Sequence, residues 1–160
     1  MNLLDIHTPS PQPWLAASAA RASDNPEASH GDNPAAVPRA LRVLIVEDEF
    51  FIALHTKDLL QGQGHTVVGV AVAADQAVSM AERERPDVVL MDIRLTGPGD
   101  GIDAAGEIRR RLGIPSIFVT ANADRQTRQR AEAVRPVGFL EKPLTEHRLR
   151  LGLSRIVNPE

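Results

Sequence analysis

The chain has no cysteine among its 160 residues, and it has no long apolar run. The lack of cysteine excludes disulfides, thiolate metal sites and thiol nucleophiles. No apolar stretch approaches the roughly 18 residues that a membrane-spanning helix needs, and the first residues lack the basic start and apolar centre of a secretory signal. The formal net charge of −3 gives no reason to expect nucleic acid or an anionic membrane as a partner. We therefore expect a soluble cytoplasmic protein.

Residues 1–40 differ in composition from the rest of the chain. They hold six of the twelve prolines, and alanine, serine, aspartate and asparagine fill most of the remaining positions. Such a segment has too little apolar surface to offset the entropy lost on ordering it. We predict a disordered N-terminal extension over 1–40. Trp14, the only tryptophan, is interpreted as an untethered apolar residue in preference to a short docking motif.

From Leu41 onward, short apolar runs alternate with helical patterns that end at glycine or proline. Strands are predicted at 41–46, 66–72, 88–91, 115–119 and 137–140, and helices at 50–63, 74–85, 102–112, 124–134 and 144–157. Strict alternation with short links indicates a parallel sheet covered by helices on both faces. Because right-handed crossovers leave few topologies, we predict a flavodoxin-like (βα)5 domain of the α/β class over 41–157, with strand order 2-1-3-4-5.

Charged and polar residues follow four of these strands. Glu47 and Asp48 follow the first strand and Asp92 follows the third, which is its neighbour in the predicted order. Three converging carboxylates repel one another unless a cation lies among them, and their oxygen atoms suit Mg²⁺. Lys142 and Thr120, from two further strand ends, add an ammonium and a hydroxyl. The joint pattern predicts a pocket for a phosphoryl group with Asp92 as the nucleophile.

Each of these residues alone also has an ordinary explanation, since acids before a helix favour its N-terminus and a lysine before proline is usually solvated. Other phosphate chemistry is not favoured. No glycine-rich loop lies between the first strand and the first helix, so nucleotide binding of the Rossmann or P-loop kind is not expected.

Over residues 41–157 the chain resembles the receiver domain of two-component response regulators. The matching segments are Val43–Glu49, Val89–Asp92, Asp100–Gly101, Ile117–Ala121 and Gly138–Pro143. The resemblance implies that Asp92 accepts a phosphoryl group from a histidine kinase or a histidine phosphotransfer protein. It also implies that Glu47, Asp48, Asp92 and the backbone carbonyl of Arg94 hold Mg²⁺.

The resemblance assigns further roles. Thr120 would be the switch hydroxyl and Phe139 the switch aromatic residue, while Lys142 would be the pocket lysine and precede a cis peptide bond to Pro143. The loop 95–101 departs from the family, because it is one residue longer and richer in glycine than the common methionine-proline version.

The chain stops three residues after its last predicted helix, so we expect a stand-alone receiver, which is a signalling domain and not a conventional enzyme. Its output would be the phosphoryl group or its own surface. In the family, helix 4, strand 5 and helix 5 form the usual readout face. An outward Leu151 and a basic helix 4 here suit a homodimer or an acidic partner, although a merely solvated face is the alternative. The basic residues are Arg125, Arg128, Arg130 and Arg135.

Two alternative functions are less favoured than phosphoryl acceptance. A receiver fold that serves only as an adaptor and takes no phosphate is disfavoured by the intact Asp48, Asp92, Thr120 and Lys142. A phosphatase with an aspartyl nucleophile is disfavoured because Arg94 occupies the position of its second acid.

Overall fold

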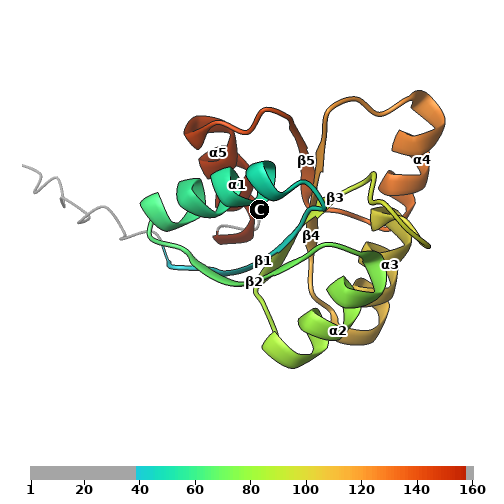
Figure 1. Ribbon diagram of the computed structural model, residues 1–160, viewed down its shortest axis with the longest axis horizontal. Helices are drawn as coiled ribbons and strands as arrows, with labels where there is room; N and C mark the ends of the chain where they lie inside the picture. The colour runs from blue at the N-terminus through green and yellow to red at the C-terminus, as the bar shows by residue number, and fades with distance from the viewer. Residues whose placement is uncertain (1–38, 158–160) are drawn as a thin grey trace, which may run out of the picture. The chain divides into compact units, whose positions relative to one another are not determined.

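The computed structural model describes residues 39–157 (Figure 1). Residues 1–38 of the predicted extension, with Trp14, lie outside the described residues. The elements are β1 (Arg42–Val46), α1 (Phe50–Gly62), β2 (Thr66–Ala71), α2 (Ala74–Glu84), β3 (Val88–Asp92), α3 (Gly101–Leu112), β4 (Ser116–Thr120), α4 (Arg125–Ala133), β5 (Gly138–Glu141) and α5 (Glu146–Val157). This order confirms the predicted alternation, with every boundary within two residues of its predicted place.

The sheet is parallel and its strand order is β2-β1-β3-β4-β5 (Figure 1). The predicted flavodoxin-like topology is therefore confirmed. Strands β3 and β4 are buried along their whole length, as expected for central strands with helices on both faces. Because all five strands run the same way, their carboxyl ends lie along one edge of the sheet.

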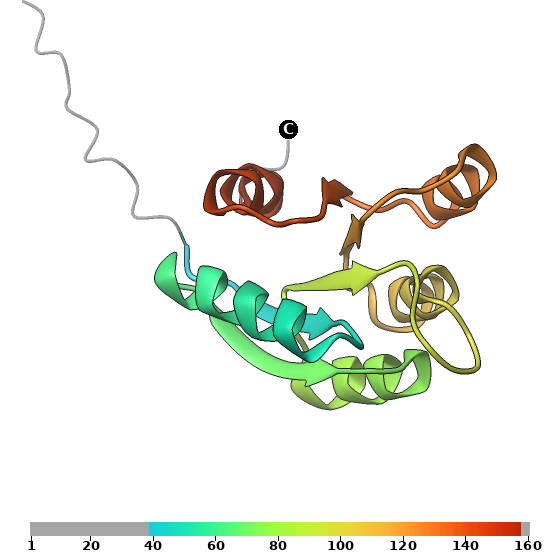
Figure 2. The same cartoon turned by 45° about the horizontal axis from the view of Figure 1, so that its top comes forward.

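The sheet lies between helices on its two faces (Figures 1 and 2). Two apolar cores, one on each face, join the helices to the sheet. On one face, Leu60 of α1 and Leu149 of α5 pack with residues of β1, β3 and β4. On the other face, α2, α3 and Ala131 of α4 pack with the alternate residues of the same strands, including Phe118. Burial of this kind contributes about 25 cal/mol per Å² of apolar surface. The strand ends therefore extend from a rigid, fully packed layer.

Helix α1 presents apolar residues to solvent as well as to the core. Its buried residues, Ala53, Thr56 and Leu60, follow the spacing of one helical face. Phe51 and Leu54, two of its predicted apolar positions, lie off that face and are 81% and 43% exposed. The apolar pattern correctly predicted a helix, but it did not identify which side faces the core.

Side-chain caps mark the starts of α4 and α5. The predicted cap of α4 is confirmed, since the Asp124 carboxylate accepts the backbone N–H of Thr127 at 2.9 Å. Helix α5 begins later than predicted because the Thr145 hydroxyl accepts the backbone N–H of Arg148 at 3.3 Å. Arg135, which was predicted to belong to the basic helix 4, lies beyond the end of α4.

Helix α5 otherwise follows its prediction. Leu149 and Leu153 are buried and Ile156 is half-buried against the same core, whereas Leu151 is 55% exposed. The Lys142–Pro143 peptide bond that precedes this helix is cis, as expected. Among residues 39–157, no helix is long and apolar enough to cross a membrane.

Candidate functional site

The three predicted carboxylates meet at the carboxyl edge of the sheet. Asp92 is the last residue of β3, not the first residue after it, and Val46 pairs with Met91 across the β1–β3 ladder. This register brings Glu47 and Asp48 beside Asp92. One oxygen atom from each carboxylate lies within 4.8 Å of those of the other two. The predicted convergence is therefore confirmed, with Glu47 and Asp92 only 4% and 6% exposed.

Lys142 bridges two of these acids. Its ammonium nitrogen lies 2.7 Å from Glu47 Oε2 and 2.7 Å from Asp92 Oδ2. Burial opposes the charged ammonium, but the hydrogen bonds and charges of Asp92 and Glu47 outweigh it and raise the pKa of Lys142. At Glu47 burial dominates over the bond from Lys142, and it raises the pKa of that carboxyl. Part of the positive charge that was predicted among the acids is therefore supplied by Lys142 itself.

The Asp48 carboxylate is bonded by Thr96, which lies in the loop that follows β3. Its Oδ2 atom accepts the backbone N–H of Thr96 at 3.1 Å and also the Thr96 hydroxyl. The hydroxyl bond is the largest influence on this carboxyl and lowers the pKa of Asp48. Asp92 Oδ1 in turn accepts the backbone N–H of Arg94 at 2.9 Å. Sequence reasoning missed Thr96, because a lone threonine in a glycine-rich loop carries no periodic or motif signal.

Thr120 lies beside the acids and borders an open cavity. It is the last residue of β4 and is buried. Together with Asp92 and Lys142 it lines a cavity of about 550 Å³, which is also lined by Phe51 of α1 and Leu144. The cavity therefore gives a molecule from solvent access to the Asp92 carboxylate.

Phe139 lies outside this cavity, on a second groove. Its ring stacks on Phe118 with the centroids 5.7 Å apart, and the guanidinium carbon of Arg128 lies 4.6 Å from its centroid. The groove, of about 420 Å³, runs between α4, β5 and α5. Thr120 lines both the cavity and this groove. It is the one predicted switch residue that touches both places, and its switching role stays a prediction.

The residues present fit a divalent cation. Three carboxylates and one ammonium leave the cluster with a formal charge of −2, and every available donor is a hard oxygen. Glu47, Asp48 and Asp92 would hold Mg²⁺, which when bound offsets the negative charge of a phosphoryl group. Arg94 lies two residues after Asp92 in the chain, and the role of its backbone carbonyl as a ligand stays a prediction.

The comparisons with known proteins agree with this fold and site. The family model described as response regulator receiver domain matches residues 43–153. The chain belongs to this family of signalling domains, which confirms the resemblance found in the sequence.

Among its relatives, the transcriptional regulatory protein PdtaR of Mycobacterium tuberculosis is 40% identical over 114 residues, which are 71% of this chain and 54% of PdtaR. The phyllosphere-induced regulator PhyR of Methylorubrum extorquens is 38% identical over 110 residues, 68% of this chain and 40% of PhyR. The chain therefore spans about half the length of these relatives. Among solved structures, the signal receiver domain of a modulated diguanylate cyclase from Desulfovibrio desulfuricans G20 superimposes with a TM-score of 0.71 at 36% identity, covering 74% of this chain and 94% of that one.

Proposed function

We propose that this receiver domain accepts a phosphoryl group on Asp92, in a Mg²⁺-dependent step, from a histidine kinase or a histidine phosphotransfer protein. The observation that carries the proposal is the cluster itself. A buried carboxylate at the end of β3 is bridged by an ammonium 2.7 Å away and opens onto a cavity beside a buried hydroxyl. Each molecule takes up one group and signals with it in the cytoplasm, so the domain is a substrate of transfer and not a conventional enzyme.

The chain's own residues account for the transfer. An Asp92 oxygen forms the bond to phosphorus while the phosphorus–nitrogen bond of the donor breaks, and the bonding electron pair stays with the imidazole. The Lys142 ammonium is within reach of the oxygens that gain negative charge, and the buried Thr120 hydroxyl is placed to donate to one of them. Leu144 and Phe51, at the start of α1, line the same cavity.

Incubation with acetyl phosphate tests this function without a protein donor. The intact chain should gain the mass of one phosphoryl group in the presence of Mg²⁺ and should gain nothing when a chelator removes the metal. An unmodified mass in both conditions would favour the alternative of an adaptor that takes no phosphate.

The protein donor would dock against the start of α1. Phe51 is 81% exposed, lines the cavity beside Asp92, and touches the 71% exposed ring of Phe50 edge-on, with the centroids 5.4 Å apart. Exposed aromatic side chains next to a reactive group are typical anchors for a protein partner. We expect Phe51→Ser to slow transfer from a phosphorylated donor by about tenfold or more, equivalent to a loss of about 1.4 kcal/mol.

Two comparisons separate docking from chemistry at the site. Phosphorylation of Phe51→Ser by acetyl phosphate should match the wild type, because the substitution leaves the carboxylates and Lys142 in place. Leu151→Ser removes an exposed apolar side chain from the other groove, and it should leave transfer from the donor unchanged. Equal slowing in both variants would argue against a docking site at α1.

The groove between α4, β5 and α5 is proposed as a face for self-association. Leu151 of α5 is 55% exposed and lines this groove together with other apolar residues such as Leu140. A carboxylate placed there would have to be desolvated in a dimer. We therefore expect Leu151→Asp to lower the molecular mass measured by light scattering, from that of a dimer to that of a monomer. A wild-type chain that is monomeric at every concentration, or a variant that stays dimeric, would reject this face as the interface.

A further inference from the structure

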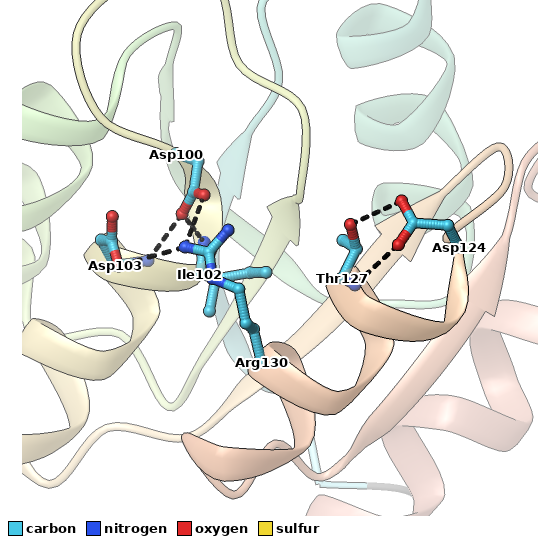
Figure 3. A network of polar contacts seen from close by, with 6 residues as sticks. All are labelled: Asp100, Ile102, Asp103, Asp124, Thr127 and Arg130. Carbon is cyan, nitrogen blue, oxygen red and sulfur yellow. Dashed lines mark hydrogen bonds and ion pairs between the residues drawn. The ribbon is translucent and has the colours of Figure 1, made fainter.

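The β3–α3 loop, residues 93–100, is fixed at its base. The backbone N–H of Gly101 donates to the Ile93 carbonyl at 3.1 Å and closes the loop. At the end of the loop, the Asp100 carboxylate caps α3 and accepts Arg130 of α4 at 2.8 Å (Figure 3). The middle of the loop therefore projects from a fixed base towards the carboxylate cluster.

Thr96 is the point at which this loop contacts the cluster. It donates two hydrogen bonds, one from its backbone N–H and one from its hydroxyl, and both end on Asp48 Oδ2. Because both bonds end on Oδ2, neither of them involves Asp48 Oδ1. The two residues are 48 positions apart in sequence, so this contact is tertiary and not a local turn.

The residue type at position 96 matters for this contact. A proline would have no N–H to donate, and an apolar side chain would have no hydroxyl. Without both donors, a half-exposed aspartate side chain would sample several rotamers. Among substitutions, serine would retain both donors, because its hydroxyl lies at the same distance from the backbone as that of threonine.

We propose that Thr96 is a positioning residue that fixes Asp48 for the divalent cation. This inference rests on the proposed use of Mg²⁺ at the site. Outer partners of metal-binding carboxylates orient them, and their loss typically costs 10- to 100-fold in metal affinity. Thr96 has that relation to Asp48, since it bonds the carboxylate without belonging to the acidic cluster. The loop that follows the phosphoryl-accepting residue would thereby control how well the metal binds.

Thr96→Val and Thr96→Ser test this role in the full-length chain. Valine keeps the shape and the backbone N–H but removes the hydroxyl, whereas serine keeps both donors. Calorimetric titration with Mg²⁺ alone, without any phosphate donor, should show about tenfold weaker binding for Thr96→Val and near wild-type binding for Thr96→Ser. Thermal unfolding without metal should be similar in all three proteins, because Thr96 is exposed.

The outcomes distinguish this inference from the proposed function. If the wild type binds Mg²⁺ and Thr96→Val binds it equally or more tightly, the positioning role is rejected while the metal-dependent function stands. If Thr96→Ser is weakened as much as Thr96→Val, the hydroxyl is not the cause and the role is also rejected. If the wild type binds no Mg²⁺ at all, the Mg²⁺ dependence of the proposed function is itself rejected.

Discussion

Replacing Asp92 with asparagine is expected to abolish phosphoryl uptake from acetyl phosphate. The amide nitrogen of asparagine is a far weaker nucleophile than a carboxylate oxygen, and the neutral side chain no longer attracts Mg²⁺. Asp92 Oδ2 also loses its charge opposite the Lys142 ammonium, 2.7 Å away. Intact-mass measurement should show only the unmodified chain.

Asp87→Asn is the matched control for this substitution. Asp87 directly precedes β3, at the opposite end of the strand from Asp92, and its carboxylate accepts the backbone N–H of Arg42 at 2.8 Å. The same chemical change there should leave phosphoryl uptake intact. If Asp92→Asn still gains the mass of a phosphoryl group, the acceptor lies elsewhere in the chain, and mapping the modified peptide would identify it.

The part of the site that could be predicted from sequence is the part set by strand ends. A parallel sheet places the last residues of its strands along one edge, so Asp48, Asp92, Thr120 and Lys142 had to converge once the five strands were recognised. The order β2-β1-β3-β4-β5 then made β1 and β3 neighbours. These inferences need only the alternation of elements and the handedness of their connections, both of which are visible in the apolar pattern.

The contacts made by loops and by long side chains could not be predicted in this way. Whether Lys142 would bond one acid, two acids or solvent could not be predicted, because its reach depends on the path of the chain after β5. The contact between Thr96 and Asp48 depends on the conformation of a glycine-rich loop, for which no periodic rule exists. The exposed side of α1 could not be predicted either, since two of its three buried positions hold Ala53 and Thr56 and only Leu60 is a large apolar residue.

Gly101→Ala is expected to have the largest effect on stability. A methyl group at this position would overlap the backbone carbonyl of Asp92 and would lie 3.1 Å from the Met91 side chain. Neither neighbour can move easily, because both belong to the fully buried β3. Overpacking against rigid backbone should lower the free energy of unfolding by about 3 kcal/mol, measured by urea denaturation. Because the displaced carbonyl belongs to Asp92, phosphoryl uptake should also fall in whatever fraction remains folded.

Gly62→Ala provides the control, since a methyl group there meets nothing within 4 Å. Gly62 ends α1, where alanine is the better helix former by up to about 1 kcal/mol. That variant should be as stable as the wild type or slightly more stable. A Gly101→Ala protein of wild-type stability would mean that the β3–α3 loop can shift away from the strand. In that case Thr96 should also lose its hydrogen bonds to Asp48, so Mg²⁺ binding would weaken even though the fold is retained.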